Sequence, residues 1–373
     1  MAVSRRTSNT CGSERATRAQ CTLQGRLAII LKPPLPLRSA QLKTVRKEQQ
    51  PEIGDLRPDE TSIHAMHGLT WKDDVTPDEK AFKVLKAVLA AGVNVWNGAD
   101  VYGTPDNNSL HLMNRYFNIF PEDADKVVLT IKSGIKDMRI STMDCPPEAI
   151  LAFVERANAS LDGKKQVDKD VPIEDTVDAL AELVKEGKIG GTQLSEVSAN
   201  TIRRAAKGGK DRYGGSGNQL VGDICLRDGV AETCAELGIP MVAYTPLGGG
   251  MLTGQIKSLA DMPANDYHRF FPRFQPENFE MNLQLVIKLE EMAAKKLCTT
   301  AQLALSWIKA QSRRDGMPVI VPVAGARSEQ RVLENVTDIP LSEEYMAEIK
   351  AILDKFAVAG DRYPPAAAKL TEY

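Results

Sequence analysis

Short runs of aliphatic and β-branched residues alternate with longer amphipathic stretches from about residue 60 to the C-terminus. This alternation is typical of repeated strand–helix units, which build a parallel sheet. The pattern predicts a weak strand within 61–69 and clearer strands at 94–100, 126–132, 192–197, 239–245 and 318–323. We therefore expect an α/β protein.

The predicted helices have clearer boundaries than the strands. Thr76, Pro77 and Glu79 have the spacing of a capping box with proline at the first helical position, and Gly92 would end that helix. Further apolar faces at helical spacing predict helices at 147–161, 172–186, 278–297, 300–311 and 342–356.

Two segments interrupt the alternation. Residues 162–171 are too short and too charged to hold a buried strand with its loops, and residues 207–219 contain five glycines without apolar periodicity. Residues 220–226 offer only a poor strand, interrupted by Gly222 and Asp223. A (β/α)8 barrel needs eight strands to close. The sequence thus predicts such a barrel with strands four and six missing or degraded.

Charge divides the chain unequally. Residues 1–50 contain ten lysines and arginines against two acidic residues, whereas the whole chain of 373 residues has a net charge of −2. We expect residues 1–55 to be a disordered basic extension and residues 56–373 to form the barrel. A basic, acid-poor N-terminus would also suit a mitochondrial transit peptide, as an alternative to a cytoplasmic location.

The remaining composition excludes several classes of protein. No run of 18 apolar residues occurs, so we expect no membrane association. The six cysteines form no Cys-x-x-Cys pair and the four histidines lack a second ligand pair, so we expect neither disulfides nor a metal. The basic N-terminal stretch lacks interleaved aromatic residues, which argues against nucleic acid as a partner.

Candidate catalytic residues follow two neighbouring predicted strands. Tyr102 lies just past strand 94–100, and Lys132 ends the next strand. Residues after neighbouring barrel strands meet at one face, so we expect these side chains to lie together. An ammonium beside a phenol favours the phenolate, and such a phenol can protonate a carbonyl oxygen. The alternative is a half-buried loop tyrosine beside a solvated lysine.

A second group of candidates follows the last two strands. Residues 244–250 (YTPLGGG) would let the backbone approach a ligand closely, because glycine has no side chain. Gly325 is followed by Arg327, Ser328 and a helix with Arg331, and loops at this place in a barrel bind phosphate. The alternative is an ordinary basic helix start.

These motifs together resemble the aldo-keto reductases. The resemblance rests on 96–103 (WNGADVYG), 128–132 (VLTIK), 244–254 (YTPLGGGMLTG) and 321–335 (VPVAGARSEQRVLEN). The fungal pyridoxal reductase branch is similar at 102–110 (YGTPDNNSL), 194–196 (LSE) and 273–279 (RFQPENF). The likeness covers about residues 62 to 365.

The resemblance implies a barrel that binds NADPH without a Rossmann fold and transfers hydride to a small aldehyde or ketone such as pyridoxal. Tyr102 would donate the proton and Lys132 would be its cationic neighbour. Asn97 stands where most members have aspartate, as it does in the pyridoxal reductase branch, and can orient the lysine. We expect a monomer whose partner is a small carbonyl compound.

The resemblance also implies binding residues. Ser195 would contact the carboxamide, with Glu196 in place of the commoner asparagine. The remaining cofactor contacts would come from Thr245, Leu247 and Gly248 at the pyrophosphate and from Gly325, Arg327, Ser328, Arg331, Glu334 and Asn335 toward the adenosine end, with Arg331 on the 2′-phosphate. Trp71, Trp96 and either Phe271 or Phe274 would line the substrate side, although each tryptophan has an ordinary core alternative.

The chain departs from the family pattern at the N-terminal hairpin and at strands four and six. Strand four carries the family's fourth catalytic position, and strand six ends in an aromatic residue that stacks on the nicotinamide. Missing strands would leave backbone edges unpaired. Two hypotheses therefore stand: an NADPH-dependent reductase, or a non-catalytic or misfolded incomplete barrel that retains at most cofactor or partner binding.

Overall fold

The computed structural model describes residues 26–31, 62–71, 75–133, 135–137, 142–143, 157, 160–161, 191–195, 197–210, 219–222, 229–264, 266–312 and 314–368. Eight of the strands in these residues close into a barrel, in the order β1, β6, β3, β2, β12, β11, β10, β9. They are β1 (Arg26–Leu31), β2 (Ile63–Ala65), β3 (Val95–Ala99), β6 (Val128–Ser133), β9 (Gly191–Ser195), β10 (Gln219–Gly222), β11 (Met241–Tyr244) and β12 (Ile320–Gly325).

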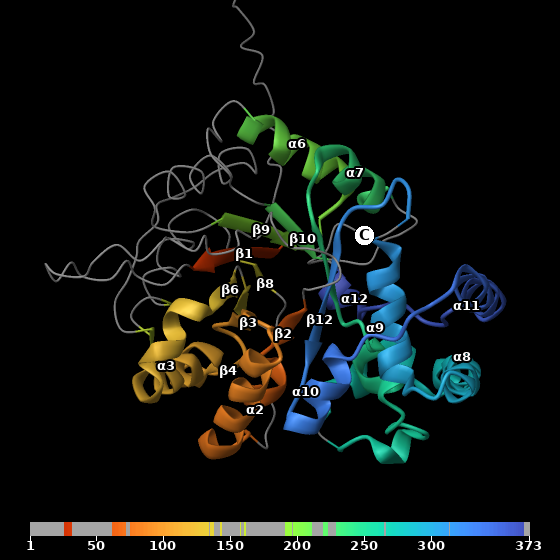
Figure 1. Cartoon of the computed structure of the whole chain (residues 1–373), viewed down its shortest axis with the longest axis horizontal. Coiled ribbons are helices and arrows are strands. Elements are labelled where there is room, and N and C mark those ends of the chain that lie inside the picture. Colours follow the sequence, from red (N-terminus) through yellow and green to blue (C-terminus); the bar gives the residue numbers. More distant parts are fainter. Residues whose placement is uncertain are drawn as a thin grey trace, which may run out of the picture.

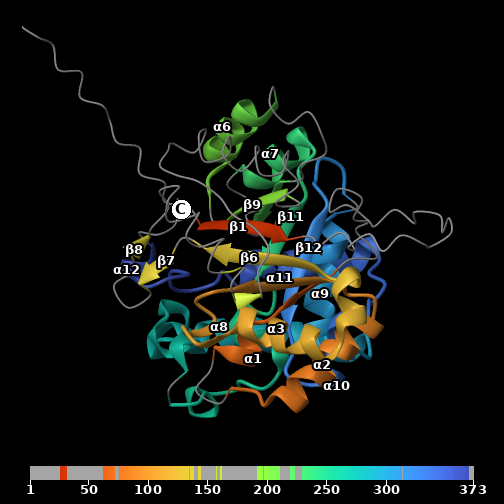
Figure 2. The same ribbon diagram turned by 90° about the vertical axis from the view of Figure 1, so that its left-hand side faces the viewer.

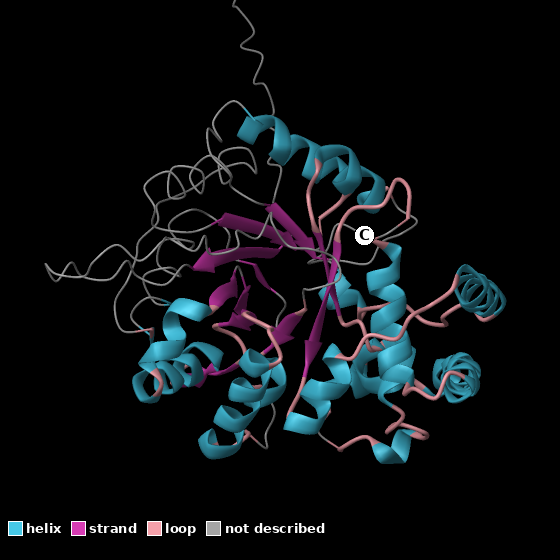
Figure 3. Ribbon diagram, in the orientation of Figure 1, coloured by secondary structure: helices cyan, strands magenta, loops and turns pink. Residues whose placement is uncertain are grey.

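Helices surround these strands (Figure 3). The α-helices are α1 (His67–Thr70), α2 (Asp78–Ala90), α3 (Ser109–Ile119), α6 (Ala199–Lys210), α7 (Val230–Leu237), α8 (Pro276–Lys295), α9 (Thr300–Gln311), α10 (Glu329–Val336), α11 (Glu343–Lys355) and α12 (Pro365–Ala368). In Figure 1, α2, α3 and α10 lie on one side of the strands and α6 and α7 on the opposite side.

Shorter elements lie in the connections between the strands and helices. Two small hairpins are formed by β4 (Gly103–Thr104) with β5 (Asn107–Asn108), and by β7 (Ile135–Asp137) with β8 (Thr142–Met143). The 3-10 helices are η2 (Pro121–Lys126), η3 (Gly248–Thr253), η4 (Leu259–Asp261), η5 (Tyr267–Phe270) and η6 (Pro272–Phe274).

The strand β1 fills the barrel position between β6 and β9. It pairs antiparallel with both neighbours, so that Ile29 lies opposite Ile131 on one side and Thr192 on the other. Figure 2 shows β1 lying between β9 and β6. The sequence prediction placed residues 26–31 in an extension outside the barrel, whereas the structure makes them one of its strands. The rest of residues 1–55 lies outside the described residues.

The poor strand expected after the glycine-rich segment is present as β10. It is parallel to β9 over four residue pairs and to β11 over two. Its position between these strands is the sixth place of the predicted barrel. Residues 162–171, where the family's fourth strand would lie, are outside the described part of the chain, as are most of the predicted helices at 147–161 and 172–186.

Side chains of the barrel strands alternate between its interior and its helical cover, as the two-residue period of a strand requires. Ile63, Val95, Val242 and Val321 belong to one buried cluster inside the strands. Residues of the opposite parity, such as Trp96, pack into a larger cluster with the helices. The barrel interior therefore holds an apolar cluster, and buried polar side chains such as Asn97 and Thr130 lie further along the same strands.

Two helix starts illustrate what local signals determine. The helix α9 begins where predicted, because Thr299 and Gln302 form a reciprocal capping box with hydrogen bonds of 3.1 and 2.9 Å. The capping box predicted for α2 is wrong. Pro77 is the N-cap, and the Thr76 hydroxyl instead accepts a hydrogen bond from Arg327 Nε at 3.3 Å.

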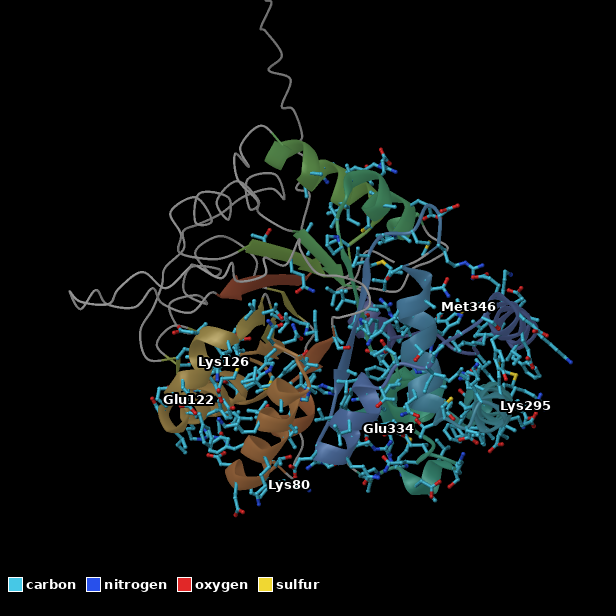
Figure 4. The ribbon with its side chains drawn as sticks, viewed as in Figure 1. Lys80, Glu122, Lys126, Lys295, Glu334 and Met346 are labelled. Atoms are coloured by element: carbon cyan, nitrogen blue, oxygen red, sulfur yellow. The ribbon has the colours of Figure 1, made fainter. Side chains whose placement is uncertain are left out.

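A buried carboxylate fixes the connection that leads into β6. Asp123 accepts hydrogen bonds from Tyr116 Oη at 2.7 Å, Lys86 Nζ at 2.5 Å and Lys126 Nζ at 2.8 Å. Burial raises the pKa of Asp123, but the bonds from Lys126, Lys86 and Tyr116 outweigh burial and hold the pKa at about 2. Lys126 and Glu122, which flank this carboxylate in the chain, are labelled in Figure 4. This network joins α2, α3 and η2 just before the strand that carries Lys132.

No helix in the described ranges is long and apolar enough to cross a membrane. Within those same ranges, no group of three or more histidine, cysteine, aspartate or glutamate side chains is arranged to hold a metal ion.

Candidate active site

The carboxyl ends of β3 and β6 bring together the three side chains expected to carry the chemistry. These strands are parallel neighbours, with Ala99 opposite Lys132. Lys132 Nζ lies 3.1 Å from Tyr102 Oη and also donates a hydrogen bond to Asn97 Oδ1. Asn97 is buried, and its Nδ2 donates to Thr130 Oγ1 at 2.6 Å. The asparagine therefore holds the ammonium against the phenol, as the sequence analysis expected.

The turn that carries Tyr102 is held from two sides. Thr70 Oγ1 donates to the Tyr102 carbonyl oxygen at 2.7 Å, and the Ser109 amide donates to that same oxygen at 3.1 Å. The Ser109 hydroxyl also bridges the amide and carbonyl of Ala99 at 2.9 and 2.8 Å. A Cβ on Gly98 would lie 2.8 Å from the Ser109 hydroxyl, so a glycine is needed there. Sequence reasoning missed Thr70 and Ser109.

Aromatic side chains form a column beside the phenol. The Trp71 ring stacks on Tyr102 with centroids 5.1 Å apart, and the Tyr267 ring stacks on Trp71 at 5.4 Å, each pair within 22° of parallel. The His67 ring lies 5.8 Å from the Tyr102 ring. Trp71 thus lies beside Tyr102, and its substrate role stays a prediction, whereas Tyr267 and His67 were missed. His67 falls inside the weak strand predicted within 61–69, so the sequence pattern did not set it apart.

The prediction that Trp96 lines the substrate side requires correction. Trp96 is fully buried, stacks on Phe117 of α3 at 5.9 Å and donates its indole N–H to the Val93 carbonyl. Its parity on β3 directs it to the helices, on the opposite face of the strand from Asn97. The core alternative for Trp96 is therefore the one that the fold adopts.

The two phenylalanines proposed for the loop after strand seven lie behind the aromatic column. Phe274 is buried in a cluster with Met251 and Phe279. Phe271 is partly buried against the same cluster and packs edge-on against Tyr267 at 5.6 Å. The structure thus brings Tyr267 to Trp71, with Phe271 behind it and Phe274 in the core of the loop.

Residues expected at the adenosine end gather where β12 leads into α10. Asn335 Nδ2 donates to the carbonyl of Gly325 at 3.1 Å, which ties the helix to the strand end. Ser328 is the N-cap of α10 and accepts from the Arg331 amide at 3.3 Å. The Arg331 guanidinium forms an ion pair with Glu334, which is labelled on α10 in Figure 4. These side chains form one polar corner of the barrel.

A second arginine lies at this corner. The side chain of Arg327 passes close to Gly68, where a Cβ would lie 3.6 Å from Arg327 Cγ. Its Nε reaches Thr76 at 3.3 Å. Two guanidinium groups thus lie near the amino end of α10, together with the carboxylates of Glu329 and Glu334.

The glycine-rich turn after β11 has an unusual backbone. Thr245 has φ of 52°, and Gly248 and Gly249 have φ of 60° and 65°. A Cβ on Gly249 would lie 3.0 Å from the His268 ring, so the glycine lets this ring pack on the turn. Leu247 immediately precedes the turn's 3-10 helix. The glycines thus allow close packing of η5 in this structure.

Ser195 is the last residue of β9 and pairs with Gly222 of β10. Its side chain and all of Glu196 lie outside the described atoms. The carboxamide contact expected of Ser195 therefore stays a prediction.

The chain belongs to the aldo/keto reductase family, whose model matches residues 66–354. This is a family of NAD(P)H-dependent oxidoreductases that act on small carbonyl compounds. The "Probable pyridoxal reductase 2" of Schizosaccharomyces pombe is 34% identical over 313 residues, covering 79% of this chain and 92% of that protein. An aldo-keto reductase of Strobilurus tenacellus is 35% identical over 300 residues, covering 77% and 85%.

The fold is shared with solved structures at lower identity. The glycerol dehydrogenase of Gluconobacter oxydans superposes with a TM-score of 0.64 at 20% identity, covering 82% of this chain and 94% of the other. A thermostable aldo-keto reductase superposes with a TM-score of 0.54. These likenesses support the barrel architecture alone.

Proposed function

We propose that this protein reduces a small aldehyde or ketone of the pyridoxal type to the alcohol, with NADPH as the cofactor. The observation that carries the proposal is the Lys132–Tyr102 contact of 3.1 Å at the ends of two adjacent strands, with Asn97 behind the lysine. The similarity to a relative named as a pyridoxal reductase supports the substrate class.

The donor set of the β12–α10 corner fits the phosphorylated end of NADPH. Arg327 and Arg331 place two guanidinium groups at this strand end, and guanidinium groups form strong, charge-assisted hydrogen bonds with phosphate. Gly325 suits close packing at this strand end, because a Cβ there would lie 3.3 Å from the Ala65 carbonyl oxygen. When bound, NADPH would supply the hydride.

The residues of this chain would manage the proton. The Tyr102 hydroxyl would donate its proton to the substrate carbonyl oxygen as negative charge develops there. The Lys132 ammonium would then stabilise the phenolate. Because Asn97 is neutral, it positions the ammonium without cancelling its charge, which aspartate would do in part.

A second candidate function is cofactor binding without turnover. The short β10, which shares only two residue pairs with β11, favours this alternative because strand six would normally help to hold the nicotinamide. Direct NADPH binding and carbonyl reduction, measured on the same preparation, separate the two candidates.

The test is NADPH oxidation by the purified full chain with pyridoxal. Tyr102→Phe should lower kcat about a thousandfold, since general acid catalysis contributes about 10²–10⁴-fold. The Kd for NADPH should stay within about twofold. Tyr345→Phe on α11, remote from the site, is the matched control and should leave kcat unchanged.

Arg331→Ala tests the cofactor assignment separately. It should raise the Kd for NADPH about tenfold, the loss of one charge-assisted contact, and leave the Kd for NADH unchanged. Wild-type protein that binds NADPH but turns over no carbonyl compound would establish the second candidate. Equal loss of NADPH and NADH affinity in Arg331→Ala would contradict the phosphate contact.

A further inference from the structure

The C-terminal part of the chain meets the end of β11. Figure 2 shows α12 on the same side of the barrel as β7 and β8, which follow the end of β6. Just before α12, Tyr363 Oη lies 2.7 Å from the hydroxyl of Tyr244, the last residue of β11. Val242 belongs to the cluster inside the barrel, so Tyr244, two residues further on, has the interior parity. The two hydroxyls therefore join residues 119 positions apart at the carboxyl end of the barrel.

Residues 359–363, which we call the C-terminal clasp, are seated by contacts at their other end. Asn282 of α8 pairs with the backbone of Ala359 through two hydrogen bonds of 3.0 and 2.8 Å. Gly360 has φ of 81°, and a Cβ there would lie 2.9 Å from the Pro272 carbonyl oxygen. This position therefore requires glycine, and the backbone of the clasp is fixed where it leaves α8 and η6.

The rings of the two tyrosines share further contacts. The Arg362 guanidinium lies over both of them, 5.4 Å from the Tyr244 centroid and 5.0 Å from the Tyr363 centroid. These are cation–π distances. The Phe271 ring meets the Tyr363 ring edge-on at 5.8 Å. The clasp thus holds the Tyr244 side chain by its hydroxyl and by one face of its ring.

Tyr244 immediately precedes the glycine-rich turn, whose first residue has a strained backbone. Thr245 has φ of 52°, a conformation that costs a non-glycine residue energy and persists only where its surroundings hold it. After Thr245, the Gly248 amide donates to the Thr245 carbonyl oxygen at 3.0 Å. Before it, Tyr244 is fixed by its pairing with Val323 and by the clasp. The clasp therefore restrains the chain directly beside the strained residue.

The turn presents an exposed backbone that suits an anion. Leu247 lies near the right-handed region, with φ of −104° and ψ of 21°, and Gly248 follows with φ of 60°. A right-handed residue followed by a left-handed one directs successive backbone N–H groups to one side, which forms a concave anion site. Thr245 and Gly248 are exposed, so a ligand can reach this backbone. The sequence analysis placed the pyrophosphate of NADPH here.

We infer that Tyr363 is a positioning residue for the cofactor. Acting through Tyr244, it holds the glycine-rich turn in the conformation that binds the pyrophosphate of NADPH. This inference rests on the proposed NADPH-dependent function. An ordered turn loses less conformational freedom when it binds, so the clasp strengthens binding. When the clasp is loosened, only a fraction of the molecules has a competent turn, and the Kd rises by the inverse of that fraction.

The experiment measures NADPH binding to the full chain through the fluorescence of NADPH, and it needs no turnover. Tyr363→Phe should raise the Kd about threefold, within the limit of about fivefold set by one net hydrogen bond. Tyr244→Phe should act similarly, and the double substitution should raise the Kd no further, because each removes the same bond. Tyr345→Phe is the matched control, since Tyr345 also has a cation over its ring, Lys296 at 4.3 Å, but lies on α11.

Gly360→Ala tests the clasp away from both hydroxyls. The added Cβ would displace the segment, so the Kd for NADPH should rise about threefold or more. Gly316→Ala is the matched control, because Gly316 is also left-handed, with φ of 76°, but its Cβ would meet no described atom within 4 Å. Both substitutions should lower the thermal midpoint, whereas only Gly360→Ala should change the Kd.

The possible outcomes separate this inference from the proposed function. An unchanged Kd in Tyr363→Phe and Gly360→Ala, or additive effects in the double variant, would overturn the inference. Tighter NADPH binding in these variants would show that the clasp competes with the cofactor, and would also overturn it. The expected Kd changes without carbonyl reduction by the wild type would support the clasp and contradict the reductase proposal; carbonyl reduction with equal Kd values would do the reverse.

Discussion

Two sides of the barrel are built in different ways. On the side that carries the candidate site, β3 and β6 run parallel over five residue pairs, from Val95 opposite Val128 to Ala99 opposite Lys132. On the other side, β10 shares two pairs with β11, and β1 enters antiparallel between β6 and β9. The geometry of the candidate site thus depends on three adjacent strand ends (β2, β3 and β6), while a different segment completes the ring.

The difference teaches which feature of the barrel is replaceable. A strand that closes the ring must satisfy the backbone groups of both neighbours, and either direction of the chain can do so. A catalytic lysine and tyrosine need side chains at fixed points on parallel neighbours. The barrel can therefore be closed by a strand from another part of the chain, whereas the strands that carry Tyr102 and Lys132 cannot be exchanged without separating these side chains.

The largest effect is expected from a substitution that disrupts the pairing of β1 with β6 and β9. Ile29→Pro deletes a backbone donor in a strand that has partners on both sides, and should lower the free energy of unfolding by at least about 3 kcal/mol. The measurement is urea unfolding of the full chain followed by circular dichroism.

Ile29→Val keeps the backbone donor and is the matched control, with an expected loss below about 1.5 kcal/mol. If proline and valine destabilised the chain equally, or neither changed the midpoint, β1 would contribute nothing to closure and the comparison would fail.

A smaller effect is expected at His64, which lies on the side of the barrel where β2, β3 and β6 run parallel. This residue is buried on β2, and its Nε2 has no hydrogen-bond partner among the described atoms. Burial lowers its pKa from 6.5 to about 4, so the unfolded chain takes up a proton first as the pH falls. The contribution of neutral His64 to the free energy of unfolding is fully present above pH 6.5 and is lost progressively toward pH 4.

Between pH 7 and pH 5, this linkage should cost the wild type about 2 kcal/mol of unfolding free energy. His64→Leu should remove that pH-dependent loss, as measured by urea unfolding at both pH values. Ile63→Val on the same strand is the control and should lower stability equally at both. An unchanged pH dependence in His64→Leu would show that another group is responsible.

The smallest expected effect concerns the backbone support of Tyr102, the candidate proton donor. Thr70→Val removes the 2.7 Å hydrogen bond to the Tyr102 carbonyl, which keeps its bond from the Ser109 amide. We expect a stability loss of about 1 kcal/mol and a decrease in kcat of about fivefold with KM little changed.

Thr337→Val supplies the comparison, because Thr337 makes a similar hydroxyl-to-carbonyl bond of 2.6 Å at the exposed end of α10. It should lower stability slightly and leave kcat unchanged. If Thr70→Val had the same kcat as the wild type, Thr70 would have no role in positioning Tyr102.

The sequence determined the features that depend on neighbours in the chain or on a simple period. The helix α9 was predicted at residues 300–311 from its apolar face, and the structure adds the local capping box of Thr299 and Gln302. Tyr102 and Lys132 could be placed together because the ends of adjacent parallel strands share one face, and the family resemblance added Asn97 to them. Their contacts confirm this proximity.

Only the tertiary structure decided the features that depend on distant partners. Residues 26–31 read as part of a basic extension, and their two partner strands lie about 100 and 165 positions further along the chain. Trp96 had two equal interpretations until the parity of β3 turned it toward α3. Tyr267 reached Trp71 through a loop whose path no periodicity describes. Strand pairing and loop packing are contacts between remote residues, so a pattern read along the chain does not fix them.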